Sequence, residues 1–135
     1  MTEGHAYQID LDPVHSVIRL TVTAETVTPD LAEDIYRHLS ETASSGGPYA
    51  AIFDFSAAKR TTIPTDTVRD FARRRPSIPT GKKQVVVGKE GHMYGLARLF
   101  QISGENVGNE FEVVQTLEEA YKIVEARPED FTRRL

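Results

Sequence analysis

Apolar and polar residues alternate along the first part of the chain, which is the pattern of β-strands. The stretches AYQID (residues 6–10) and SVIRLTVT (residues 16–23) both show it. The second stretch has three apolar residues on one side: Ile18, Leu20 and Val22. Val17 points to the other side, and Pro13 favours a turn between the two stretches. The pattern predicts a β-hairpin with one buried face and one face closer to water.

Other segments repeat their apolar residues with the spacing of an α-helix. They are residues 28–47, 62–76, 91–102 and 116–127. Thr28 and Pro29 suit the start of the first of these helices, because threonine caps helices and proline fits their first turn. Thr116 and Glu119 have the spacing of a capping box at the start of the last one.

Between these helices lie short, almost wholly apolar runs, which are typical of strands covered on both faces. They are YAAIFDF (49–55), KKQVVVG (82–88) and EFEVV (110–114). Strands that alternate with helices favour a mostly parallel sheet, which the opening hairpin makes mixed. We therefore predict a single α/β domain over residues 1–135, with the order β-β-α-β-α-β-α-β-α. It should have a four- to five-stranded mixed sheet, about four helices, a core from about residue 7 to 126 and a C-terminal tail over 127–135.

Composition excludes several classes of protein. The 135 residues include no cysteine, which removes disulfides, thiolate catalysis and cysteine-ligated metals. No apolar run approaches the roughly 18 residues that span a bilayer, and the N-terminal residues lack the apolar region of a signal peptide. We expect a cytoplasmic protein without a membrane span.

Charge is spread unevenly along the chain. From Lys59 to Lys89 there are nine Lys/Arg and two Asp/Glu, a net charge of +7, whereas the remainder has seven and eighteen, a net charge of −11. This asymmetry indicates either a surface for an acidic partner or simply a solvated basic face. A nucleic-acid surface usually adds interleaved aromatic residues and a basic pI, but the pI here is about 5.6. We expect no nucleic-acid partner.

The predicted helix over residues 91–102 is apolar around more than half of its circumference. One stripe consists of Met93, Leu96, Ala97 and Phe100. Leu99 and Ile102 lie off this stripe, whereas a surface helix normally keeps its apolar residues on one side. The excess must be covered by a neighbouring helix, by a partner or second copy of the chain, or by a small apolar ligand.

Catalytic and cofactor motifs are missing from the sequence. The glycines around residues 88–95 fit neither a P-loop nor a dinucleotide fingerprint, and no histidine has a second metal ligand at i+2 or i+4. Asp54 ends a buried strand, where it is either functional or a cap for the next turn. An enzyme would have only Asp54, His92 and Tyr94 as candidates. We predict no catalytic residue, metal or cofactor.

The segment AAIFDFSAAKRTTIPTDTVRDFARRR (residues 50–75) resembles the central strand and helix of STAS domains, the fold of bacterial anti-sigma factor antagonists. VVVGKEGHMYGLARLFQ (85–101) and FEVVQTLEEAYKIV (111–124) are similar to later strand–helix pairs of a small bacterial STAS-like branch. The resemblance runs from about Tyr7 to Ala126.

This resemblance implies a non-enzymatic switch, in which a serine in an Asp-Ser-Ser-Gly-like loop before the second helix is phosphorylated by the partner kinase. The corresponding loop here, Lys59 to Thr65, lacks that motif and has Pro64 in its middle. Its hydroxyls are Thr61, Thr62 and Thr65, which are candidate phosphorylation sites or simply turn and cap residues. Lipid carriers of the CRAL-TRIO type resemble the STAS fold in outline.

Taken together, the sequence predicts a binding or regulatory module that recognises a protein partner, or a second copy of itself, through the second and third helices. The candidate surface consists of Leu99, Ile102, Arg73, Arg74, Tyr94 and Arg98. A carrier of a small apolar ligand or lipid is one alternative, and an enzyme is the other.

Overall fold

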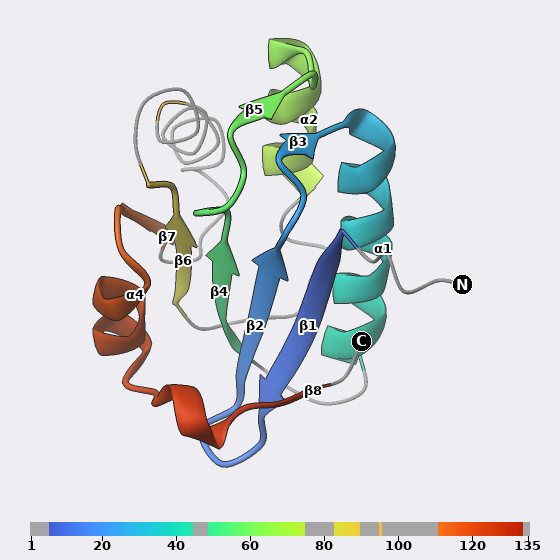
Figure 1. Ribbon diagram of the computed structural model, residues 1–135. Coiled ribbons are helices and arrows are strands. Elements are labelled where there is room, and N and C mark those ends of the chain that lie inside the picture. The colour runs from blue at the N-terminus through green and yellow to red at the C-terminus, as the bar shows by residue number, and fades with distance from the viewer. Residues whose placement is uncertain (1–5, 45–48, 75–82, 90–94, 96–110, 134–135) are drawn as a thin grey trace.

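The computed structural model describes residues 6–44, 49–74, 83–89, 95 and 111–133; of Phe71, Ala72 and Arg74 only the backbone is described. Figure 1 shows a mixed main sheet with helices on both of its faces and a small second sheet. The elements are β1 (Tyr7–Asp12), β2 (Val17–Val22), β3 (Thr26–Val27), α1 (Pro29–Ser44), β4 (Ala50–Asp54), β5 (Arg60–Thr61), α2 (Thr65–Arg74), β6 (Gln84–Val87), β7 (Phe111–Val114), α4 (Leu117–Val124), a 3₁₀ turn η3 (Pro128–Asp130) and β8 (Thr132–Arg133).

The main sheet has six strands in the order β7-β6-β4-β2-β1-β8. Strands β2, β4, β6 and β7 run parallel, and β1 pairs antiparallel with β2, as the hairpin prediction requires. The prediction of an α/β domain with a mixed sheet is confirmed. The predicted count of four or five strands is wrong, because β8 adds an outer strand beside β1 and β3 pairs with β5 in a separate two-stranded sheet.

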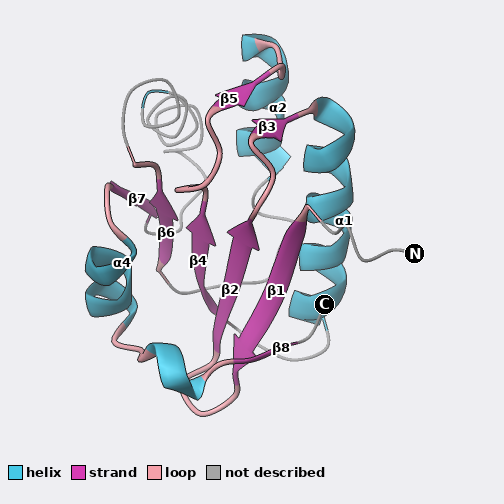
Figure 2. Ribbon diagram, viewed as in Figure 1, coloured by secondary structure: helices cyan, strands magenta, loops and turns pink. Residues whose placement is uncertain are grey.

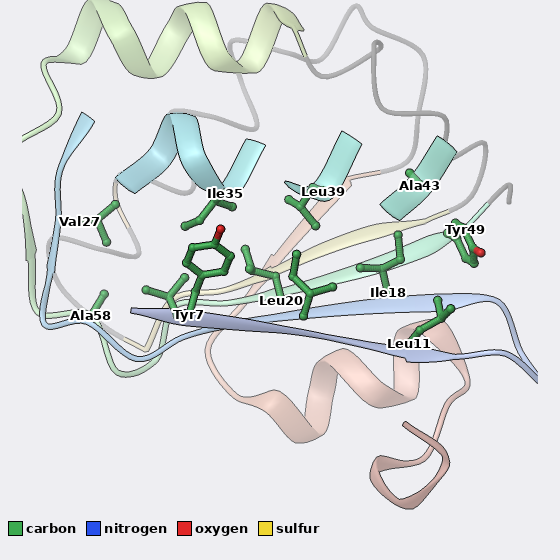
Figure 3. Packing of buried hydrophobic residues seen from close by; sticks show 12 residues of the cluster. Tyr7, Leu11, Ile18, Leu20, Val27, Ile35, Leu39, Ala43, Tyr49 and Ala58 are labelled. Carbon is green, nitrogen blue, oxygen red and sulfur yellow. The ribbon is translucent and has the colours of Figure 1, made fainter. Parts of the chain in front are cut away.

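Helix α1 packs on one face of the sheet (Figure 3). It begins where the sequence predicts, because the hydroxyl of Thr28 accepts a hydrogen bond from the N–H of Leu31 at 3.1 Å. The residues on its inner side are buried: Ile35, Leu39 and Ala43. They pack with three buried residues of β2, which are Ile18, Leu20 and Val22. The predicted apolar side of β2 is therefore confirmed.

Helix α4 packs on the opposite face, where Ala120 is fully buried against β4 and β6. Its capping box is present: the Thr116 hydroxyl accepts from the Glu119 N–H, and the Glu119 carboxylate accepts from the Thr116 N–H. Val17 lies in this second core, so it does point away from the other apolar residues of β2. Figure 2 shows the two helices on the two sides of the sheet.

The polar face of the hairpin is more covered than the alternation of its residues predicts. Asp10 and Asp12, on the face of β1 that should lie closer to water, are buried. The reason is the C-terminal segment, predicted as a tail: after α4 it forms η3 and then β8, which pairs with β1 at Asp10 and Leu11. This segment therefore forms the edge strand of the sheet and is not a free tail.

At the other end of the sheet, the strand pair β3–β5 joins the connection before α1 to the connection before α2. Figure 1 shows this pair and α2 beyond the carboxyl ends of β2 and β4. In α2, Val68 is buried, and the side chains of Phe71 and Ala72 lie outside the described residues. Within the described ranges, no helix is long and apolar enough to cross a bilayer.

Candidate functional site

The loop and helix that follow β4 form the part of the predicted partner surface that the structure describes. Asp54 ends β4, and the chain then passes through β5 into α2. Parallel strands β2, β4 and β6 end at the same edge of the sheet, which is where open α/β sheets usually bind ligands. This carboxyl edge is therefore the first place to look for a site.

Asp54 has a structural role at this edge. Its Oδ1 atom accepts hydrogen bonds from the Ser56 N–H at 2.9 Å and from the Ser56 hydroxyl at 2.6 Å. An aspartate that bonds to the backbone two residues later stabilises a turn. The interpretation of Asp54 as a turn-capping residue is supported by this geometry.

The three threonines of the loop differ in their surroundings. The Thr61 hydroxyl donates to the Val27 carbonyl at 2.7 Å and accepts from the Ile63 N–H at 3.0 Å, so it ties β5 to β3. Thr62 and Thr65 are exposed, and Thr65 is the first residue of α2. Of the three predicted hydroxyls, Thr61 is the one committed to internal bonds.

The exposed side of α2 carries charges of both signs. Five of its residues line an open depression of about 350 Å³: Asp66, Thr67, Arg69, Asp70 and Arg73. Arg69 pairs with Asp66 at 3.4 Å, yet the Asp66 side chain is 97% exposed. An exposed pair of this kind contributes little to stability, because water screens it. The charges of α2 therefore remain available to a binding partner.

The basic segment between Lys59 and Lys89 is exposed wherever its side chains are described. Those side chains are Lys59, Arg60, Arg69, Arg73, Lys83 and Lys89. Lys59 lies 3.6 Å from Glu25, and both side chains are more than half exposed. The Arg60 guanidinium donates to the Thr26 hydroxyl at 2.9 Å. These cations lie on the surface, as both interpretations of the segment require.

Most of the remaining predicted residues lie outside the described part of the chain. They are Leu99, Ile102, Tyr94, Arg98 and the enzyme candidate His92, together with the side chain of Arg74. The self-contact at Leu99 and Ile102 and the lipid cavity beside residues 93–102 therefore stay predictions. So does the enzyme alternative, because His92 and Tyr94 would be needed to complete it.

The structure also assembles a polar cluster that the sequence did not reveal, between β1 and α1. The Tyr7 hydroxyl donates to Asp34 Oδ2 at 2.6 Å and also contacts Nδ1 of His38. Burial and then the hydrogen bond to Asp34 raise the pKa of Tyr7. The same hydrogen bond, helped by His38 and Arg37, lowers the pKa of Asp34. The spacing of Asp34 and His38, one helical turn apart, is the only local signal for this cluster.

A second cluster joins the C-terminal segment to the hairpin. Arg19 donates to buried Asp10 at 2.9 Å and to the Tyr121 hydroxyl at 2.6 Å, and its guanidinium lies 4.4 Å from the centre of the Phe131 ring. Burial alone would lower the pKa of Arg19, but the bonds to Asp10 and Tyr121 raise it overall. Arg133 donates to the other oxygen of Asp10 at 3.0 Å.

A third cluster contains three groups of metal-ligating type. Asp12, His15 and Asp130 each place one ligand atom within 4.8 Å of the others. Burial alone would raise the pKa of Asp12, but hydrogen bonds from the ring and backbone of His15 and from the backbone of Val14 lower it overall. The sequence gives no hint of this set, because Asp130 follows His15 only after most of the chain.

Compared with protein families, curated proteins and solved structures, the chain has no significant match to any of them. The α/β fold with a mixed central sheet therefore rests on the structure alone. Any function must be argued from the surfaces and clusters described above.

Proposed function

We propose that this protein is a non-enzymatic, STAS-like binding module that recognises an acidic or mixed-charge protein partner through α2 and the loop before it. The observation that carries the proposal is the exposed charge of α2. Arg69 and Arg73 lie on its surface beside Asp66 and Asp70, at the carboxyl edge of the sheet. Of the α2 side chains that the structure describes, Val68 is the buried one.

The mixture of signs favours a protein over a nucleic acid. The negative phosphate backbone of a nucleic acid is attracted by cations, and carboxylates beside those cations repel it. Asp66 and Asp70 alternate with Arg69 and Arg73 along one side of α2. Charges in a fixed alternating order instead select one complementary protein surface and reject others.

The resemblance to STAS domains supports a regulatory role at the same place. The opening hairpin, the helices α1 and α4 that follow β2 and β7 along the chain, and the position of α2 after β4 agree in outline with that resemblance. If the module is switched by phosphorylation, Thr62 and Thr65 are the better candidates, because the Thr61 hydroxyl is occupied by bonds to Val27 and Ile63.

The proposal is tested by affinity capture of partners, identified by mass spectrometry, with a charge reversal of α2. The variant Arg69→Glu/Arg73→Glu should lose specific partners that the wild type retains, because the two cations become repulsive to an acidic surface. Lys122→Glu, an exposed reversal on α4, is the matched control and should retain them. A captured set that does not change with the α2 reversal contradicts the proposal.

The third predicted helix requires a separate experiment. Sedimentation of the wild type and of Leu99→Asp reports whether that residue lies in a contact between two copies of the chain. A dimer that dissociates in the variant would make self-association part of the function. A monomer in both cases would leave α2 as the recognition surface.

A further inference from the structure

The turn of the β1–β2 hairpin meets the C-terminal turn η3, and the two place potential metal ligands side by side. Asp12 and His15 come from the hairpin, and Asp130 comes from η3. Nδ1 of His15 lies 2.7 Å from Oδ2 of Asp12 and 3.8 Å from Oδ2 of Asp130. One nitrogen and two carboxylate oxygens thus converge from opposite ends of the chain.

Asp12 is held in a fixed orientation. Its side chain is fully buried, and its Oδ1 atom accepts hydrogen bonds from the N–H groups of Val14 at 2.9 Å and His15 at 3.1 Å. These bonds leave Oδ2 directed at the imidazole. Backbone bonds to the outer oxygen of a carboxylate ligand are the usual support of a metal site, because they orient the inner oxygen.

The charges around this point are unbalanced in favour of a cation. Two carboxylates, those of Asp12 and Asp130, approach one imidazole, that of His15. Two further charges lie nearby. Arg127, which precedes η3, is 3.4 Å from Asp130 and 69% exposed, and Glu129 of η3 is 3.8 Å from Arg127. An exposed arginine compensates only part of this negative charge, because water screens it.

We propose that Asp12, His15 and Asp130 form a site for one divalent transition-metal ion, with zinc as the best fit, that fastens the C-terminal turn to the hairpin. Two oxygens and one ring nitrogen suit zinc, whereas magnesium and calcium prefer oxygen alone. Ligands of one tetrahedral zinc lie about 3.3 Å apart. To bind one ion, His15 and Asp12, now 2.7 Å apart, must therefore separate slightly, and Asp130, 3.8 Å from His15, must move closer. The His15 side chain is 41% exposed, which lets water take the remaining position.

The site is tested by titrating zinc chloride into the tag-free, chelator-treated protein in a calorimeter, with magnesium chloride as the comparison ion. We expect one zinc per chain with a dissociation constant in the micromolar range or below, and no saturable binding of magnesium. His15→Gln and Asp130→Asn should each weaken zinc binding at least about tenfold. Both substitutions keep the size and polarity of the side chain, and circular dichroism checks that the variants fold.

Two matched controls distinguish zinc binding at this site from nonspecific attraction of zinc to negative charge. Glu129→Gln removes the same charge as Asp130→Asn one residue away, and His38→Gln removes a histidine from the Tyr7–Asp34 cluster. Both controls should bind zinc like the wild type. In addition, zinc should raise the melting temperature of the wild type and of both controls, but not of His15→Gln or Asp130→Asn. A wild type that does not bind zinc, or four variants that respond alike, would overturn the proposal.

Discussion

The two ends of the sheet hold their charges in opposite ways. At the hairpin end, buried Asp10 and Asp12 are paired with Arg19, Arg133 and His15. At the carboxyl end, the charges of β5 and α2 lie on the surface, and their ion pairs are exposed to water. The same types of side chain therefore occur in two different dielectric surroundings.

The difference shows where charge serves the fold and where it is available for binding. A buried ion pair cannot be broken cheaply, because the remaining charge would stay out of water without a partner. Exposed charges are screened and contribute little to stability. We therefore expect substitutions at the hairpin end to change stability and substitutions on α2 to change recognition.

The largest effect should come from removing residues 128–135. This deletion takes away Phe131, which covers Arg19, and Arg133, which pairs with Asp10, and it also removes the strand beside β1. We expect a loss of about 3 to 5 kcal/mol in the free energy of unfolding, measured by urea denaturation. A truncated protein as stable as the full chain would show that the C-terminal segment is only a tail.

Arg19→Met should have the next largest effect. The methionine keeps the apolar stem of the side chain but leaves Asp10 with the more exposed Arg133 as its cation, and the Tyr121 hydroxyl loses its donor. We expect a loss of about 3 kcal/mol by the same measurement. Arg127→Met, on the exposed surface of the same end, is the control and should leave the unfolding free energy nearly unchanged.

Tyr7→Phe removes one hydroxyl from the cluster between β1 and α1. The hydrogen bond to Asp34 is lost, and the partly exposed side chains of Asp34 and His38 can turn to water, so we expect a loss of about 1 kcal/mol at pH 7. Because the pKa of Tyr7 is raised, its contribution is complete below the unfolded pKa of about 10 and is lost as the pH rises through the folded pKa. The wild type should therefore lose more stability above about pH 10 than Tyr7→Phe does, as denaturation at several pH values would show.

Asp34→Asn removes the carboxylate charge from the same cluster. The pKa of Asp34 is lowered, so its charge stabilises the fold above the unfolded pKa of about 3.9, and this stability is lost as the pH falls through the folded pKa. We expect melting temperatures of the variant to depend less on pH between about pH 5 and pH 3 than those of the wild type. The difference should be small, because the Asp34 side chain is 39% exposed.

The smallest effect on stability should come from Arg69→Ala and Arg73→Ala on α2. Both side chains are exposed, so urea denaturation should give the wild-type curve within error. The same variants should weaken capture of the protein partner, which would separate binding from folding. A clear loss of stability in either variant would mean that these charges serve the fold, and the contrast between the two ends would fail.

Local patterns were enough to predict much of the fold. The cap at Thr28 and the capping box of Thr116 and Glu119 are contacts within a few residues of the chain. The apolar sides of α1 and α4 also show in the sequence, because their apolar residues recur every three or four positions. The small strands β3, β5 and β8 were missed, because a two-residue strand has no periodicity to detect. The sequence also gave no signal for the polar clusters, apart from the spacing of Asp34 and His38.

What the sequence determined by itself is the type and order of the main elements, together with the uneven distribution of charge along the chain. The spacing of apolar residues along the sequence involves only residues a few positions apart, so strands and helices can be recognised from it without knowing the fold. Only the tertiary structure decided which charges are buried and which groups meet, because strand order brings Arg133 to Asp10 and Asp130 to His15 across more than a hundred residues. No local sequence pattern predicts these contacts, because they form only when the C-terminal strand β8 pairs with β1 at the edge of the sheet.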